Sequence, residues 1–442
     1  MTNKIRPLAV ACLFTAVTAC STTSPQSQSE ALIDAASKVD AQSRGAERYS
    51  ISSKAGVEEL VREALDHSPA VQAGEAKVRR MLAKVPQAKS LQDPKAKLST
   101  GSMAETAAGR VDAMVGVEQM IPFPGKLREA SEAARKEALA AEAALQGIRL
   151  EVAHQTRSAY WDYYFARQTL TVTRESRSAL EQVRDSVDAL VSANKATQND
   201  QLRLAGEFGK VEKALVEAGQ AEATATAKLN SLLNRPSGSK LPAPKASGLA
   251  SKGKLTQLLD KAEREHPSVR AAEAKLASFE HRLKRADLEK YPDFSFGLQH
   301  AFVSDSGLAP SANGRDQFFG TLGISIPLWQ EPKRAMADEA RAGIDESEAE
   351  LGDARSRLRF RVEDAWLRAK SAEQLITLFD KQIIPEAKQS FEVVLTGYVA
   401  GKQQFVDVLD AWRNLLAFEL QQAGNRAAFG KAIAALKSAV GE

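Results

Sequence analysis

Cysteine, aromatic residues and net charge are all scarce in this sequence. Its 442 residues include two cysteines and 6% aromatic residues, and 60 basic against 56 acidic side chains leave a net charge of +4. Two cysteines cannot form a disulfide framework, and near-balanced charge argues against nucleic acid as a partner, because nucleic-acid-binding domains carry a clustered basic face. No run of about 18 apolar residues occurs, which argues against a membrane-spanning helix. The apolar residues are instead rich in Ala, Leu and Val, a composition that favours helices.

The sequence also lacks the constellations that carry out catalysis or hold metals. It has no glycine-rich phosphate loop, nucleophile elbow or paired catalytic carboxylates. The five histidines show no metal-ligand spacing; they are His67, His154, His266, His281 and His300. We therefore expect no enzymatic activity, no metal site and no soluble cofactor.

The N-terminal residues read as an export signal with a lipid anchor. Lys4 and Arg6 precede an apolar run, Pro7 to Val17, that is too short to span a bilayer but suits a signal peptide. Val17-Thr18-Ala19-Cys20 resembles a bacterial lipobox, which implies removal of residues 1–19 and attachment of a diacylglycerol and an acyl chain to Cys20. Ser21 in place of Asp favours sorting to the outer membrane by analogy with that class. A plain cleavable signal is the alternative.

Ordered matches between the two halves indicate an internal duplication. The matching pairs are His67-Ser68-Pro69 with His266-Pro267-Ser268, Ile121-Pro122 with Ile326-Pro327, and Ala159-Tyr160 with Ala365-Trp366. We predict a Ser-, Thr- and Gln-rich tether over 20–56, repeats over 57–235 and 255–442, and a Pro- and Gly-containing linker over 236–254.

Both repeats have the same predicted plan: a helix of about 30 residues (57–91 and 255–290), a strand pair, and a long helical hairpin. A helix from Pro124 to about Ala193 would be on the order of 100 Å long. The second hairpin begins at Pro332, with an interruption at Pro385 and a turn at 397–401. Such helices need partners along their length, and Ala-rich seams predict antiparallel coiled-coil packing; free-standing four-helix bundles are the alternative. The fold class is mainly α with β.

The predicted strands alternate in character, most clearly in the second repeat. The apolar positions that would share one face are Phe294, Phe296 and Leu298 in one strand and Leu322, Ile324 and Ile326 in the next. Four strands in one chain cannot close a barrel, because single-chain barrels begin at eight, and open edges are not tolerated in lipid. Either the strands form a soluble sheet, or several chains combine them and these six residues face lipid. Three chains would supply twelve strands.

The sequence resembles the TolC-type outer-membrane efflux family over nearly the whole of its mature part, and two motifs are the most specific part of this resemblance. Ile121-Pro122-Phe123-Pro124-Gly125-Lys126-Leu127 is similar to the branch that serves heavy-metal cation pumps, and Gly397 to Ala411 resembles the motif at the periplasmic end of the second hairpin. The resemblance implies a homotrimer with a 12-strand outer-membrane β-barrel continuous with a periplasmic α-helical barrel. It implies a passive conduit for heavy-metal cations or drugs, with a periplasmic adaptor and an inner-membrane pump of the resistance-nodulation-division type as partners.

The same resemblance assigns roles at the periplasmic end. Asp407 and Asp410 lie three apart, hence on one helix face, and their positions in the family line the constricted tunnel end; a solvated helix face is the alternative. Tyr398 matches a position that ties the hairpin to its neighbour, with Asp200 as its acceptor and Gln403 at the position of a second latch residue.

The competing function is a lipid-anchored periplasmic adaptor or spacer without a channel. Adaptors usually have one hairpin and compact β modules, so the duplicated strand pairs argue against it. An envelope hydrolase is a further alternative, and the sequence lacks the residues for it.

The lipobox prediction is testable with one substitution. Cys20→Ala should abolish metabolic labelling with palmitate, because it removes the thiol that carries the lipid. Insertion of the strands should persist, since acyl chains contribute only about 0.8 kcal/mol per buried methylene. Palmitate label that persists in the variant would show that the anchor lies elsewhere.

Overall fold

The computed structural model describes residues 55–100, 105–106, 108–246, 253–305 and 313–442. All of them belong to one compact unit, Tyr49–Glu442. The predicted signal peptide, Cys20 and nearly all of the predicted tether lie outside the described residues.

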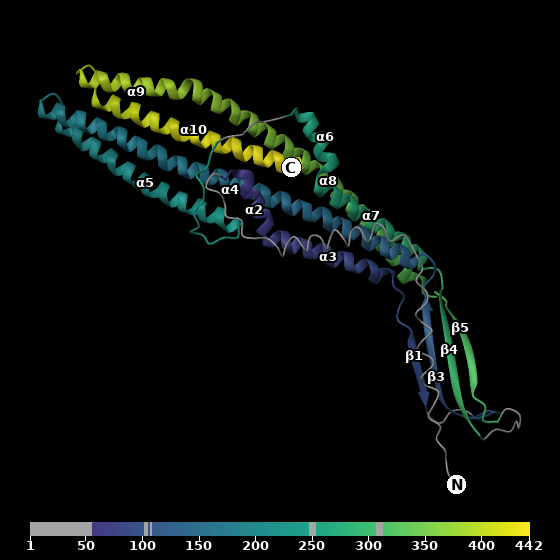
Figure 1. Ribbon diagram of the computed structural model, residues 1–442. Coiled ribbons are helices and arrows are strands. Elements are labelled where there is room, and N and C mark those ends of the chain that lie inside the picture. Colours follow the sequence, from purple (N-terminus) through teal and green to yellow (C-terminus); the bar gives the residue numbers. More distant parts are fainter. Residues whose placement is uncertain (1–54, 101–104, 107, 247–252, 306–312) are drawn as a thin grey trace, which may run out of the picture. The chain divides into compact units, whose positions relative to one another are not determined.

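The same order of elements occurs twice along the described chain (Figure 1). The first series is α2 (Val57–His67), α3 (Pro69–Lys89), β1 (Lys95–Thr100), β2 (Glu105–Thr106), β3 (Gly109–Ile121), α4 (Lys126–Ser192) and α5 (Gln198–Leu232). The second is α6 (Leu255–Glu265), α7 (Pro267–Leu288), β4 (Asp293–Ser304), β5 (Gln317–Ser325), α8 (Gln330–Leu378), a π-helical segment (Phe379–Ile383), α9 (Ile384–Val399) and α10 (Phe405–Ala439).

The prediction of one helix of about 30 residues at the start of each repeat is wrong, because each is two helices. The break falls at Ser68 and at His266, whose backbones are extended with ψ of 119° and 131°. The next residue is proline in both cases, and proline disfavours the helical conformation in the residue before it. Pro69 and Pro267 then begin α3 and α7, where their missing N–H costs no hydrogen bond.

The interruption predicted at Pro385 is a π-helical segment just before it. Proline lacks the N–H that would bond one turn back, and the wider turn of residues 379–383 absorbs this gap without ending the helical run. α8, the π-helical segment and α9 therefore follow one another without a loop.

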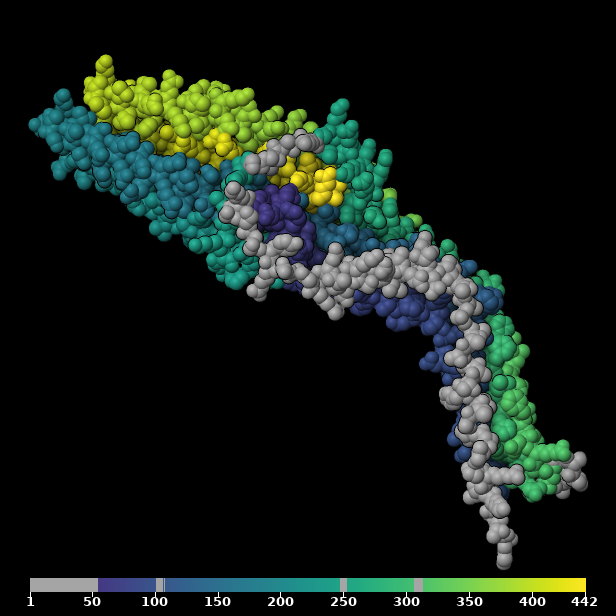
Figure 2. Space-filling view, viewed as in Figure 1, coloured from purple at the N-terminus to yellow at the C-terminus, as the bar shows by residue number. Residues whose placement is uncertain are grey.

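The helices pack side by side along their length (Figure 1). α4 packs against α3, α7, α5 and α10, and α8 packs against α7 and α10. At one end the α4–α5 and α9–α10 turns lie together, and at the other end the chain continues into the strands (Figures 1 and 2). One edge of the helical layer is α3 with α5, and the other is α8 with α9.

Small residues allow this close packing, and aromatic residues fill the space they leave. An aromatic run of α4 lies in the core: Tyr160, Trp161, Tyr163 and Tyr164 are at most 4% exposed. Trp161 of α4 lies against Gly430 of α10, where any Cβ would overlap the indole ring. The hydroxyl of Tyr160 bonds both to the N–H (2.8 Å) and to the carbonyl (3.2 Å) of Lys245, which holds the connecting segment on the helices.

The strands form one antiparallel sheet in the order β1-β3-β4-β5, with β2 paired to β3. Val117 lies opposite Ala96 on one side and Leu298 on the other, and Phe296 lies opposite Leu322. These positions share one face of the sheet. Its exposed apolar residues, called here the apolar face, are Leu98, Val115, Val117, Phe296, Leu298, Phe302, Phe318, Leu322 and Ile324.

Two of the six residues predicted to face lipid differ from the expectation. Ile326 is exposed but lies beyond β5, which ends at Ser325 because Pro327 cannot donate to a strand ladder. Phe294 is in β4 and opposite Ile324, yet it is half-buried. That this face contacts lipid stays a prediction.

Both outer strands of the sheet have open edges within the described chain. β1 and β5 each pair with one neighbour, so each presents backbone N–H and C=O groups on its other side. β1 and β5 also run in opposite directions, because three antiparallel pairings separate them.

The contact between Gly430 and Trp161 generates a stability prediction. Gly430→Ala should lower the thermal midpoint of the purified protein, followed by far-UV circular dichroism, because an overpacked core typically loses about 1–3 kcal/mol. Gly424→Ala on the same helix is the matched control: its Cβ would lie 3.6 Å from Phe165, an ordinary contact, and Ala gains about 1 kcal/mol over Gly in a helix. Equal midpoints for the two variants would contradict the packing argument.

Candidate functional site

The turns that join the paired long helices have the same geometry in both halves; their end of the molecule is called here the tip. Two residues after the last residue of α4 and of α9, the chain has a residue with positive φ: Asn194 (54°) and Gly401 (72°). In both turns the next residue donates its N–H back into the helix at 2.8 Å, Lys195 to Leu190 and Lys402 to Gly397. This ending satisfies the last carbonyls of the helix and directs the chain into the return helix.

The return helices α5 and α10 both begin with a capping box. The Asp200 carboxylate accepts the backbone N–H of Thr197 at 3.1 Å, and the Asp407 carboxylate accepts that of Gln404 at 3.1 Å. Asp200 and Asp407 thus hold equivalent places in the two halves, and each satisfies a donor that its helix start would leave unpaired. Asp407 is nevertheless exposed at the surface.

Asp410 belongs to a cluster of charges that the sequence analysis did not find. Arg413 donates to the Asp410 carboxylate at 2.9 Å and to the Glu207 carboxylate of α5 at 2.6 Å, and Lys210 reaches Glu207 at 2.8 Å. Asp410 and Arg413 are three residues apart, so the sequence carried a signal for that pair. Glu207 lies on the other hairpin, and nothing local connects it to Arg413.

Glu207 is buried, and its environment keeps it ionised. Burial alone would raise the pKa of this carboxyl, but hydrogen bonds from Arg413 and Lys210 outweigh it and hold the pKa below its usual range. The ion pair between Arg413 and Glu207 therefore joins the two hairpins through a charge-assisted hydrogen bond.

Tyr398 lies in the hydrophobic core of the tip. It is 7% exposed, and its ring lies 5.5 Å from that of Phe405. Burial and the nearby charge of Asp200 raise the pKa of Tyr398 to about 12. The tip core also includes Val183, Leu204 and Trp412, whose indole N–H donates to the Ser176 carbonyl at 3.2 Å.

The predicted latch bonds do not form within one described chain. The Tyr398 hydroxyl is buried without a hydrogen-bond partner there, and the Asp200 carboxylate is engaged in its own cap. Gln403 packs its side chain against Gly397. The structure thus brings Tyr398 and Asp200 near each other, and the latch itself stays a prediction about an assembled protein.

A second polar cluster lies where the strands meet the helices. Lys126 is 5% exposed, and its ammonium group binds Asp293 at 2.8 Å, Glu289 at 3.0 Å and the Tyr291 carbonyl at 3.3 Å. Burial alone would lower the pKa of Lys126, but these carboxylates raise it. Phe123 stacks on Tyr291 with ring centroids 4.5 Å apart, and its N–H donates to Asp293.

The equivalent junction of the second half has no such partners within the described chain. Leu328 and Trp329 occupy the connection from β5 to α8 and are 74% and 80% exposed. Glu331, five residues after Ile326 as Lys126 is after Ile121, is exposed as well. This junction comes directly after β5 in the chain, the strand whose outer edge is open.

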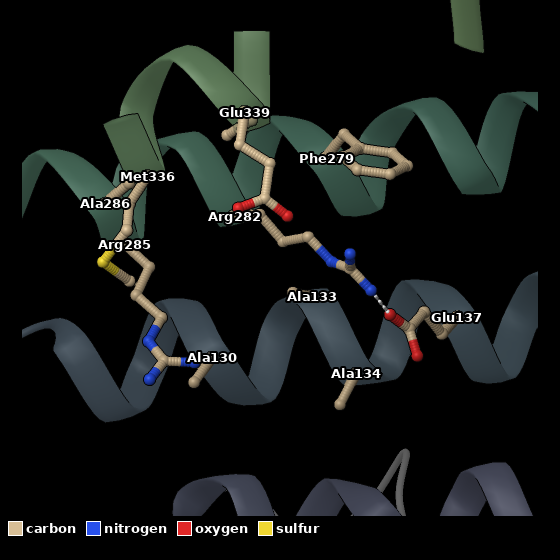
Figure 3. Close-up of a pocket in the computed structure, with 11 residues that line it drawn as sticks. Ala130, Ala133, Ala134, Glu137, Phe279, Arg282, Arg285, Ala286, Met336 and Glu339 are labelled. Carbon is tan, nitrogen blue, oxygen red and sulfur yellow. Dashed lines mark hydrogen bonds and ion pairs between the residues drawn. The ribbon is translucent and has the colours of Figure 1, made fainter. Parts of the chain in front are cut away.

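A cavity of about 350 Å³ opens between α4, α7 and α8 (Figure 3). Ala130, Ala133 and Ala134 line one side, and Arg282 crosses it to pair with Glu137 while lying 4.8 Å over the Phe279 ring. Arg282 and Glu137 pair across it and alanines form much of its wall, so we interpret the cavity as a packing gap. Among the described residues, no three His, Cys, Asp or Glu side chains gather to hold a metal. None of the described helices has the length and apolar character needed to cross a membrane.

Comparison with known proteins gives distant relatives of the same architecture. Protein CyaE of Bordetella pertussis is 26% identical over 304 residues, which span 66% of this chain and 64% of that protein. The outer membrane protein VceC of Vibrio cholerae is 18% identical with a TM-score of 0.73, covering 87% of this chain and 96% of that one. The open-state outer membrane channel MtrE of Neisseria gonorrhoeae is 17% identical with a TM-score of 0.71, covering 90% and 93%. The solved structures establish the fold.

The model of the outer membrane efflux protein family matches residues 60–235 and 258–442, separately in the two halves and over most of the chain. The chain therefore belongs to the outer membrane efflux protein family.

Proposed function

We propose that three copies of this chain form a passive efflux channel in the outer membrane, with a 12-strand β-barrel continuous with a periplasmic α-helical barrel. The observation that supports the proposal is the antiparallel sheet, in which β1 and β5 have open edges and one face is apolar and exposed. In lipid each unpaired backbone group costs several kcal/mol, so the edges need partners. The antiparallel directions of β1 and β5 allow each chain to pair with the next.

The helical layer supports the same assembly. This layer has two different edges, α3 with α5 on one side and α8 with α9 on the other. Head-to-tail contacts between unlike edges produce a closed ring when the rotation closes. A ring of sheets and a ring of helices built from the same copies would share one axis, because the strands continue directly into α4 and α8. The result is a tube through both.

The channel would conduct without chemistry of its own. Its partners would be a periplasmic adaptor and an inner-membrane pump, of the resistance-nodulation-division type by the resemblance of the sequence. Its cargo would be heavy-metal cations or drugs, chosen by that pump. A lipid anchor at Cys20 would hold the chain at the outer membrane. The competing adaptor or spacer function gives no reason for an apolar sheet face with unpaired edges.

At the tip, the aspartates would form the narrow end of the tunnel. Threefold symmetry would repeat Asp407 and Asp410 around the axis, with Tyr398, Asp200 and Gln403 joining neighbouring hairpins. Asp410 shares Arg413 with Glu207, so Asp407 would carry the larger part of the uncompensated charge. Such a ring attracts cations at close range.

Arginine substitutions on neighbouring strand positions test the membrane face. Phe296→Arg should abolish insertion and assembly, since an arginine near the middle of a bilayer costs about 2–4 kcal/mol per chain on a barrel. Ser295→Arg, one residue away on the opposite face and next to Glu118, should be milder. Heat-modifiable trimers on gels and conductance in planar bilayers measure both. Greater damage from Ser295→Arg would mean that the apolar face does not meet lipid, and would sink the channel proposal.

Removal of the tip charges tests the gate. Asp407→Asn keeps a cap acceptor while removing the charge, and combined with Asp410→Asn it should weaken cation preference and block by multivalent cations in planar bilayers. Charges about 6–8 Å apart at an effective dielectric near 20 repel by about 2–3 kcal/mol per pair, which bound cations would screen. Asp338→Asn, on α8 far from the tip, is the control. If the double variant had the same ion selectivity as the Asp338→Asn control, both aspartates would belong to a solvated helix face and not to a gate.

A further inference from the structure

Each half of the chain has a sharp bend between its two short helices, called here a joint, and a single residue forms it. Ser68 ends α2 and precedes α3, and His266 ends α6 and precedes α7. Both residues are buried, with 5% and 7% of their surface exposed. In both halves the side chain at the joint accepts a backbone N–H from the first turn of the following helix, and so caps that helix. The two joints share their geometry and differ in their capping group.

The two capping groups respond differently to pH. The hydroxyl of Ser68 accepts the N–H of Val71 at 3.4 Å, and a serine hydroxyl does not titrate. In the second half, Nδ1 of His266 accepts the N–H of Ser268 at 3.2 Å and lies 2.7 Å from the Ser268 hydroxyl. A ring nitrogen accepts a hydrogen bond while it carries no proton, and histidine changes its charge between pH 5 and 8. Of these two caps, the second therefore depends on pH.

We propose that His266 is a pH-sensitive switch at the α6–α7 joint, whose protonation removes the cap of α7 and loosens α6 from α8. The α2–α3 joint, which Ser68 caps, would keep its structure under the same conditions. The switch lies within one chain, so it goes beyond the proposed channel and does not require the assembly.

Protonation would change both the hydrogen bonds and the electrostatics of the joint. Because Nδ1 accepts the Ser268 N–H, the proton of the neutral ring is on Nε2, and a hydrogen bond to the backbone of Ser438 ties the ring to α10. A second proton, on Nδ1, could be donated to the Ser268 hydroxyl, but the Ser268 N–H would lose its acceptor. The new positive charge would also lie at the positive end of the α7 macrodipole. The capped start of α7 therefore requires the neutral ring.

The direction of the pH effect follows from the surroundings of the ring. Burial lowers the pKa of His266 and the like charge of Arg361 on α8 lowers it further, which together outweigh the hydrogen bond to Ser438. The folded joint thus binds the proton more weakly than the unfolded chain, in which histidine titrates near about pH 6.5. The stability that the neutral ring contributes is complete above that pH and is lost as the pH falls below it. Acid, and not base, should open the joint.

Other charged side chains beside the joint come from α6, α7, α10 and the C-terminal residue. They are Lys261, Glu263, Arg264, Glu265, Arg270, Lys437 and Glu442. Lys261 pairs with Glu442, Lys437 pairs with Glu58 of α2, and Glu263 pairs with Arg359 of α8. Arg264, Glu265 and Arg270 are exposed, where water screens their charge. Within the described residues no carboxylate pairs with His266, so a protonated ring would lack a close counter-ion.

The joint lies in the core that holds α6 on the long helices. Ala262, before the joint, and Val269, after it, are each 1% exposed and belong to one cluster with Val362 of α8 and Leu436 of α10. α8 continues without a loop into the π-helical segment and α9. A change at His266 would therefore reach the second hairpin, whereas α2 would keep its packing on α4 in the first half.

Hydrogen exchange followed by mass spectrometry tests the switch on the full-length protein in mild detergent. Samples at about pH 7.5 and about pH 5.5 lie on either side of the ordinary histidine pKa, and rates are corrected for the intrinsic pH dependence of exchange. Peptides over residues 262–275 should lose protection severalfold at the lower pH, while peptides over residues 63–76, which contain the Ser68 joint, should keep theirs. Equal loss at the two joints, or none at either, would overturn the proposal.

Substitutions at the two joints identify the titrating group. His266→Ser gives the second joint the cap of the first, and His266→Asn supplies another strong, non-titrating cap. In both variants the 262–275 peptides should stay protected at about pH 5.5, because no ring remains to be protonated. His67→Asn removes the histidine of the other joint without changing a cap, so its 262–275 peptides should respond to acid as in the wild-type protein. Acid loss in the two His266 variants as large as in the wild-type protein would show that another group opens the joint.

Discussion

The backbone of the two edge strands sets the constraint on which the rest of this molecule depends. β1 and β5 have unpaired N–H and C=O groups, and the sheet between them has an apolar face. In water a charged or bulged edge could remain open, but in lipid it could not. The apolar face is suited to lipid and open edges are not tolerated there, so the channel proposed above would need further copies to pair β1 and β5.

Duplication provides a way to meet that requirement with one sequence. A chain made of two like units joins them internally through β3 and β4, and in the proposed ring a similar strand pairing would recur between chains. The two halves have diverged at this junction: Lys126 lies buried among carboxylates, whereas its equivalent in the second half is the exposed Glu331.

The sequence predicted the features that depend on local pattern. Strand alternation, the end of the first long helix near Ala193 and the turn at residues 397–401 all follow from periodicity and turn residues. It did not predict Lys126 with Glu289, or Arg413 with Glu207, because these partners meet only after long helices align. The helix breaks at Ser68 and His266 were readable from the following prolines, but the helical pattern on both sides was taken as continuous.

At the tip, the residues that stabilise the helix starts also limit how the two hairpins can move. The caps at Asp200 and Asp407 fix each carboxylate to the first turn of its helix, so these charges move only when α5 and α10 move. Arg413 ties α10 to Glu207 of α5. Separation of the two hairpins would break that contact and leave a buried carboxylate with Lys210 alone, which is costly. A movement that carries both hairpins of one chain together keeps it. In the proposed channel, opening of the tip would therefore displace neighbouring chains relative to one another more easily than it would separate the two hairpins of one chain.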